Sequence, residues 1–96
     1  MAAPVPQTVA FAIGGPISRA DLPALGRRVG ALLEGSGAKL ILCDVTKADP
    51  DAVTLDALAR VHLAARRRGC DTRVQGASSE LLALLDFAGL LAVLAA

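Results

Sequence analysis

Short apolar segments alternate along the chain with longer stretches in which apolar residues recur every three or four positions. The first pattern is typical of strands, and the second is typical of helices with one apolar face. The predicted strands are residues 8–13, 39–44 and 71–75, and the predicted helices are residues 22–34, 52–68 and 79–88. The third strand alternates polar and apolar side chains, which indicates an exposed face or a position near an edge of the sheet.

Each of the longer predicted helices has a stripe of side chains that is expected to face the core. The stripe of the first helix consists of Leu22, Leu25, Val29, Leu32 and Leu33, and that of the second consists of Leu55, Leu58, Val61 or His62, and Ala65. Asp51 and Ser78 stand where the second and third helices begin, and both residue types are good helix caps.

Strand and helix therefore alternate three times, and the intervening segments are long enough for right-handed crossovers between parallel strands. We predict an α/β fold with a mainly parallel sheet in βαβαβα order. The expected organisation is a flexible N-terminal tail at residues 1–7 and a single small domain at residues 8–96. Residues 90–94 fit either a last short strand or a helical turn.

The composition narrows the classes of function. The 96 residues are 54% hydrophobic but only 2% aromatic, so the chain lacks the platforms on which bases and sugars stack. A net charge of +1 gives no general attraction to nucleic acid or to anionic membranes. Residues 81–96 are apolar, but Asp86 and Gly89 interrupt them, and a membrane-spanning helix needs about 20 residues. We therefore expect neither nucleic-acid binding nor membrane insertion.

Cys43 and Cys70 are the two cysteines. One lies near the end of a predicted strand and the other just before the next strand begins. Parallel strands would keep them farther apart than the Cα separation of about 7 Å that a disulfide tolerates. Free thiols, together with residues 1–7 that do not resemble a signal peptide, predict a cytoplasmic protein.

Residues suited to catalysis are few. His62 is the only histidine, and its nearest charged neighbours in sequence are arginines, which are neither bases nor metal ligands. Gly14 and Gly15 follow a strand without the pattern of a phosphate-binding loop, so they predict a plain turn. The arginines at residues 66–68 suit the negative end of a helix dipole. We therefore expect no enzyme and no cofactor.

An acidic segment joins the second predicted strand to the second predicted helix. Asp44, Asp49 and Asp51 could bind Mg²⁺, but capping of the helix and a solvated loop explain them better, so we expect no metal. In open α/β sheets, the carboxyl end of a strand and the helix that follows are where ligands and partners bind. The candidate partner-binding residues are Asp44, Thr46, Asp49, Asp51, Val53, Thr54, Asp56, Arg60, Leu63 and Arg67.

This segment resembles the STAS domain, the family of anti-sigma-factor antagonists and sulfate-transporter tails, and the likeness extends from residue 9 to residue 94. In the family, a strand ends in Asp-hydrophobic-Ser, and Asp44-Val45-Thr46 stands at that place. The family's helix opens with Asp-Ser-Ser/Thr-Gly-Leu, whose first and last residues match Asp51 and Leu55. Further similarity lies at residues 57–69, with an Arg-Gly exit, and at residues 79–82 and 87–90, with a closing Gly-Leu.

The phosphorylation motif of that family is degenerate in this chain. In the family, a partner kinase phosphorylates the second hydroxyl residue of this motif. Val53, which cannot be phosphorylated, stands at that position in this chain. Thr54 would become the acceptor if the loop alignment slipped by one residue, because a phosphate is stabilised at a helix N-terminus. The register of Leu55 and Leu58 favours Thr54 as an ordinary residue of the first turn.

The resemblance implies a non-enzymatic regulatory module that docks through residues 44–67 onto a kinase-fold anti-sigma factor or a similar protein. One alternative is an accessory STAS-like subunit that binds a transporter ATPase. Another is a phospho-switch with Thr54 as the acceptor. The sequence predicts neither the oligomeric state nor a small ligand.

Overall fold

A computed structural model describes residues 8–90 and 94 of the chain. Its elements are β1 (Thr8–Ala12), a short 3₁₀ helix η1 (Arg19–Asp21), α1 (Leu22–Leu33), β2 (Leu40–Asp44), α2 (Ala52–Arg66), β3 (Asp71–Gln75) and α3 (Ser79–Phe87). The predicted alternation of strands and helices is confirmed, and every bound lies within two residues of its predicted place. The predicted tail at residues 1–7 lies outside the described residues.

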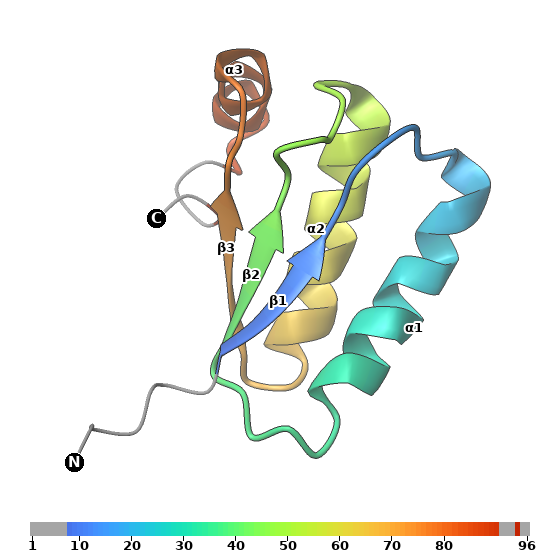
Figure 1. The fold of residues 1–96 in the computed structure, drawn as a ribbon, viewed down its shortest axis with the longest axis vertical. Helices are drawn as coiled ribbons and strands as arrows, with labels where there is room; N and C mark the ends of the chain where they lie inside the picture. The colour runs from blue at the N-terminus through green and yellow to red at the C-terminus, as the bar shows by residue number, and fades with distance from the viewer. Residues whose placement is uncertain (1–7, 91–93, 95–96) are drawn as a thin grey trace.

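The three strands form one parallel sheet in the order β1-β2-β3. Figure 1 shows α1 and α2 side by side on one face of this sheet, and α3 beyond the end of β3. The strands β1, β2 and β3 follow one another across the sheet in a single direction, and right-handed crossovers connect them. Both connecting helices, α1 and α2, therefore lie on the same face of the sheet. Among the described elements, α1 and α2 therefore cover one and the same face of the sheet.

The core lies between the sheet and these two helices. Ile41 and Cys43 of the central strand are completely buried, and Phe11 of β1, which pairs with Cys43, is also buried. Val29 from α1 and Leu58 from α2 are completely buried as well. Phe87 is exposed, so the described core consists of aliphatic side chains, Phe11 and the two cysteines.

Two details of the predicted core are wrong. Leu32, expected in the buried stripe of α1, is 42% exposed. In α2, Thr54, Ala57 and Ala64 are buried, while Leu55 is only half-buried. Small side chains let α2 lie close to both the sheet and α1, so hydrophobicity alone does not identify the inner face of this helix.

The C-terminal segment is described only in part. Leu94 is buried and helical, and its amide donates to the carbonyl of Leu90 at 3.0 Å. Residues 91–93 of the predicted closing segment lie outside the described residues. Within the described ranges, none of the helices combines the length and the apolar character that crossing a membrane requires.

Candidate functional site

The candidate site begins where β2 ends. The Oδ1 atom of Asp44 accepts hydrogen bonds from the amide of Thr46 at 3.0 Å and from its hydroxyl at 2.6 Å. These hydrogen bonds, with a smaller effect of Lys47, lower the pKa of Asp44 because they stabilise the charged carboxylate. Asp44 and Thr46 are exposed, whereas Val45 between them is buried. The turn is therefore anchored in the core and presents its polar groups to solvent.

Backbone hydrogen bonds attach this turn to the segments on both sides of it. The amide of Val45 donates to the carbonyl of Gln75 at 2.9 Å, and the amide of Gly15 donates to the carbonyl of Lys47 at 3.0 Å. A side chain on Gly14 would lie 3.1 Å from the Cβ atom of Lys47, so a glycine suits the close approach of the two loops. Gly14 and Gly15, which the sequence predicts only as a plain turn, thus help to position the site.

Thr46 also packs against the turn after β3. Gly76 has a φ of +79°, and a Cβ atom on it would overlap the hydroxyl of Thr46. Glycine is favoured here both by the left-handed backbone and by the absence of a side chain. Two loops that are distant in sequence therefore determine the conformation of the turn at residues 44–46.

A hollow of about 320 Å³ lies beside this turn. It is lined by Ala12, Ile13, Gly14, Asp44, Thr46 and Lys47. The hollow is at the carboxyl edge of the sheet, where α/β proteins commonly bind their ligands. Part of the candidate site is therefore concave.

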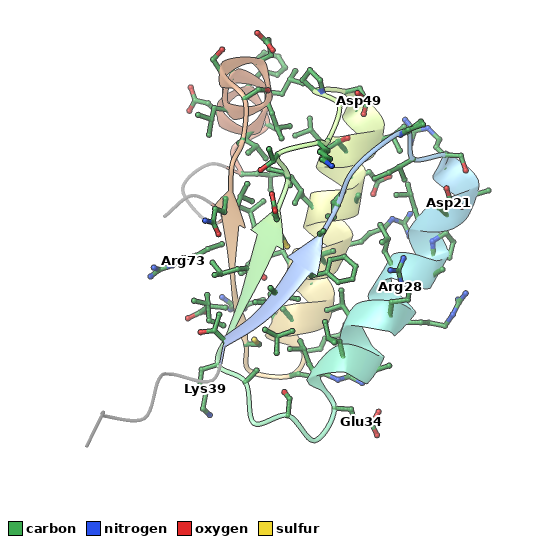
Figure 2. The ribbon with its side chains drawn as sticks, viewed as in Figure 1. Asp21, Arg28, Glu34, Lys39, Asp49 and Arg73 are labelled. Carbon is green, nitrogen blue, oxygen red and sulfur yellow. The ribbon has the colours of Figure 1, made fainter. Side chains whose placement is uncertain are left out.

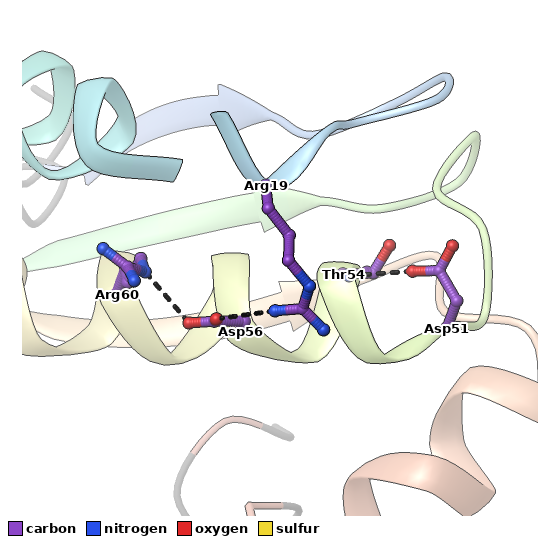
Figure 3. Close-up of polar contacts among 5 residues, drawn as sticks. All are labelled: Arg19, Asp51, Thr54, Asp56 and Arg60. Carbon is purple, nitrogen blue, oxygen red and sulfur yellow. Dashed lines mark hydrogen bonds and ion pairs between the residues drawn. The ribbon is translucent and has the colours of Figure 1, made fainter. Parts of the chain in front are cut away.

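The start of α2 forms the next part of the site. Asp51 is the N-cap, as predicted, and its Oδ1 accepts a hydrogen bond from the amide of Thr54 at 2.9 Å (Figure 3). Asp49 and Asp51 are exposed, and Val53 is half-buried. Thr54 is only 2% exposed, so a kinase would reach its hydroxyl only if this turn of the helix opened. The burial of Thr54 counts against the phospho-switch hypothesis.

An ion-pair network lies on the outer face of α2. Asp56 accepts a hydrogen bond from Arg60 at 2.9 Å, and the guanidinium of Arg19 lies 3.5 Å from its other carboxylate oxygen (Figure 3). Asp56 and Arg60 stand four residues apart on α2, a spacing that favours an ion pair on a helix. Arg19 was missed because it belongs to η1, far from α2 in sequence, and no local pattern indicates such a contact.

Leu63 lies farther along the same helix. Its side chain is 56% exposed, and together with Arg60, Ala64 and Arg67 it lines a shallow hollow of about 200 Å³. Leu63, a candidate partner-binding residue, is thus an exposed leucine among charged side chains. Because a helix rises about 1.5 Å per residue, Leu63 lies roughly 18 Å beyond Asp51. The candidate residues therefore form a strip along α2 rather than one compact cluster.

The described residues do not include a group of three or more His, Cys, Asp and Glu side chains that could hold a metal ion. In particular, Asp44, Asp49 and Asp51 do not form such a group. His62 is half-buried, and within the described part of the chain its Nδ1 atom has no hydrogen-bond partner. Both cysteines are buried and unpaired, and burial raises the pKa of Cys43 to about 12.

Comparison with known proteins gives a likeness of fold. No protein-family model matches the chain, and no curated protein matches its sequence. The crystal structure of a sulfate transporter family protein from Wolinella succinogenes is similar to it, with a TM-score of 0.66 and 20% sequence identity. The match covers 98% of this chain and 75% of that chain. This likeness agrees with the expected STAS-like fold.

Proposed function

We propose that this chain is a non-enzymatic, STAS-like regulatory module that docks in the cytoplasm onto a kinase-fold anti-sigma factor or a similar protein. The observation that carries the proposal is the exposed strip at residues 44–67. It combines a rigid polar turn, a capped helix start and an exposed leucine surrounded by charged residues. A partly exposed apolar anchor within a polar rim is a typical feature of protein interfaces.

The strip is held in shape before any partner binds. Asp44 and Thr46 are fixed by their mutual hydrogen bonds, and Asp56 is held between Arg19 and Arg60. A surface that is already ordered loses less conformational entropy on association. The mixed charges of the strip favour a partner with complementary charges of both signs.

A second candidate function is that of an accessory subunit bound to a transporter ATPase. It is favoured by the similarity in fold to a protein named as a member of a sulfate transporter family. The same strip would form the contact. Measuring binding to the purified ATPase of a transporter encoded beside this chain, and to an anti-sigma factor of the same genome, distinguishes the two functions.

Replacing Leu63 tests the docking surface. For a partner that binds through this strip, we expect Leu63→Ala to weaken binding by about tenfold, because an interface anchor contributes on the order of 1–2 kcal/mol. Leu82→Ala is the matched control, since Leu82 is an exposed leucine on a different helix, α3. Isothermal titration calorimetry with each purified partner measures the difference.

The two variants separate the possible outcomes. Loss of affinity in Leu63→Ala with unchanged affinity in Leu82→Ala supports docking through α2. Equal affinities for the wild type and Leu63→Ala, or an equal loss in both variants, would rule out this surface. Circular dichroism checks that both variants remain folded, which is expected because both side chains are exposed.

A further inference from the structure

β1 lies at one edge of the described sheet. Among the described strands it pairs with β2 alone, and the amide of Ile13 donates to the carbonyl of Asp44 at 2.9 Å. In an extended strand, the backbone groups of alternate residues point to opposite sides. The amides and carbonyls of Ala10 and Ala12 therefore point away from β2, toward the outer edge of the described sheet.

The sequence of β1 lacks the residues by which proteins usually protect edge strands. The sequence of β1 is Thr-Val-Ala-Phe-Ala, with neither a charged residue nor a proline. Lysine, proline and bulges at sheet edges normally prevent pairing with other chains. The two exposed alanines also leave room for another strand to approach the backbone.

A groove runs along this edge, between β1 and α1. One hollow of about 630 Å³ is lined by Ala10, Phe11, Ala12, Arg28, Ala31 and Leu32. A second hollow of about 270 Å³ shares Ala12 and Arg28 with the first and continues to the turn after β1. The groove therefore follows the strand and has α1 as its other wall.

Arg28 supplies a positive charge in the middle of this groove. Its guanidinium lies 5.4 Å from the centre of the Phe11 ring, which is a cation–π contact. No carboxylate among the described residues forms an ion pair with Arg28. Leu32, one turn farther along α1, is 42% exposed. From Arg28 toward Leu32 the groove thus has a positively charged position followed by an apolar one, and Asp21 lines the other end of the groove.

We infer that β1 and α1 form a second docking surface, separate from the strip on α2, which takes up an extended segment of another protein by strand addition. The segment pairs with the backbone of Ala10 and Ala12. One of its side chains is acidic and faces Arg28, and a large apolar side chain two residues away faces Leu32.

The spacing of this motif follows from the geometry of the two elements. Arg28 and Leu32 are four residues apart on a helix, which corresponds to about 6 Å along its axis. Alternate residues of a strand point to the same face and are about 6.6 Å apart. A strand lying over the groove therefore presents side chains i and i+2 to Arg28 and Leu32.

Charge disfavours a second copy of this chain as the occupant. Pairing of two β1 strands about a twofold axis would bring two Arg28 guanidinium groups toward the same groove. Like charges at an interface oppose association, and β1 itself has no carboxylate to offset them. An acidic segment of a different protein fits the groove better.

The test uses two short, capped peptides rich in threonine. One has Glu and Leu two positions apart, and the other has Lys in place of Glu. Nuclear magnetic resonance titration of the full chain measures their affinities and the shifts of the Ala10 and Ala12 amides. We expect the Glu peptide to bind about tenfold more tightly, and Arg28→Glu to reverse this preference.

Arg27→Glu is the matched control, because Arg27 is an exposed neighbour on α1 that does not line the groove. It makes the same change of charge and should leave the Glu peptide preferred. Leu32→Ser should weaken binding of the Glu peptide while keeping its preference over the Lys peptide. This second variant keeps the test valid if Arg28→Glu perturbs the packing of Phe11.

Equal affinity for the two peptides, or binding without shifts at Ala10 and Ala12, would overturn the inference. A molecular mass that doubles with concentration, with shifts at β1, would instead assign the edge to a second copy. Leu63→Ala should not affect peptide binding, so failure of this inference is distinguishable from failure of docking through α2.

Discussion

Thr72 carries the one hydroxyl group of β3, on the strand face that α2 covers. It is 2% exposed, pairs with Ile41, and its Oγ1 atom has no hydrogen-bond partner within the described part of the chain. A buried polar group without a partner costs about 1–3 kcal/mol. Thr72→Val keeps the shape of the side chain and should raise the free energy of unfolding by about 1 kcal/mol, as measured by urea denaturation.

Val74 provides the control for this prediction. It lies on the same strand and the same face, and it packs against the core. Val74→Thr adds a hydroxyl where Thr72→Val removes one, so it should lower the stability. A loss of stability in Thr72→Val would show that the Thr72 hydroxyl has a partner after all.

The hydroxyl of Thr46 controls the acidity of Asp44. The lowered pKa of Asp44 arises first from the side-chain hydrogen bond of Thr46, then from its backbone amide. Thr46→Ala should therefore raise the pKa of Asp44 toward the ordinary aspartate value, whereas Thr46→Ser should keep it low. Titration of the Asp44 carboxyl carbon by nuclear magnetic resonance measures both variants.

The lowered pKa of Asp44 makes the stability of the folded chain depend on pH. Because the pKa of Asp44 is lower in the folded chain than in the unfolded chain, its contribution to stability is complete above the unfolded pKa. The contribution is lost as the pH falls through the folded pKa. In Thr46→Ala, the free energy of unfolding should therefore depend less on pH in the acidic range. An unchanged pKa in that variant would contradict the assigned role of the hydroxyl.

At the scale of elements, α2 depends on its first residue. The carboxylate of Asp51 accepts the amide of Thr54 at 2.9 Å, and loss of an N-cap costs about 1 kcal/mol. Asp51→Ala should lower the free energy of unfolding by about this amount. Asp51→Asn should retain most of the stability because an amide oxygen can cap as well. Equal losses in both variants, by chemical denaturation, would show that capping is not the cause.

The helices and strands could be predicted well because the sequence patterns that indicate them extend over only a few neighbouring residues. The caps Asp51 and Ser78 and the pair of Asp56 and Arg60 are spaced by helix geometry, and all three are present. The contact of Arg19 with Asp56 joins segments that only the folded chain brings together. The sequence could therefore predict the strip on α2 but not its link to η1.

Contacts between elements that are distant in sequence also explain where the predicted burial of side chains was wrong. The pattern of apolar side chains placed Leu32 in the core, but the core-facing stripe of α1 is complete without it, and it remains 42% exposed. Thr54 is among the candidate partner-binding residues, although it is only 2% exposed. Burial at such positions is decided by how α1 and α2 pack against the sheet.

At the scale of the whole molecule, the sheet is covered unevenly. Figure 2 shows Arg28 on the side of α1 and Arg73 on the opposite side of the sheet. β2 has a neighbour on each side, whereas β1 and β3 each have one within the described sheet. Resistance to opening is expected to be highest in β2, which carries Ile41 and Cys43, and lower at the two edges.

Hydrogen exchange measures this difference and tests directly whether the outer edge of β1 is accessible. Amides of Ile41 and Cys43 should exchange only with global unfolding, because both residues are fully buried in the central strand. Within β1, Phe11 points its amide toward β2 and should be protected, whereas Ala10 and Ala12 should exchange quickly. Equal protection of these three residues would mean that the outer edge of β1 is already covered in the free protein. In that case strand addition would require displacement of whatever covers it, whereas rapid exchange at Ala10 and Ala12 leaves their backbone groups available to a partner.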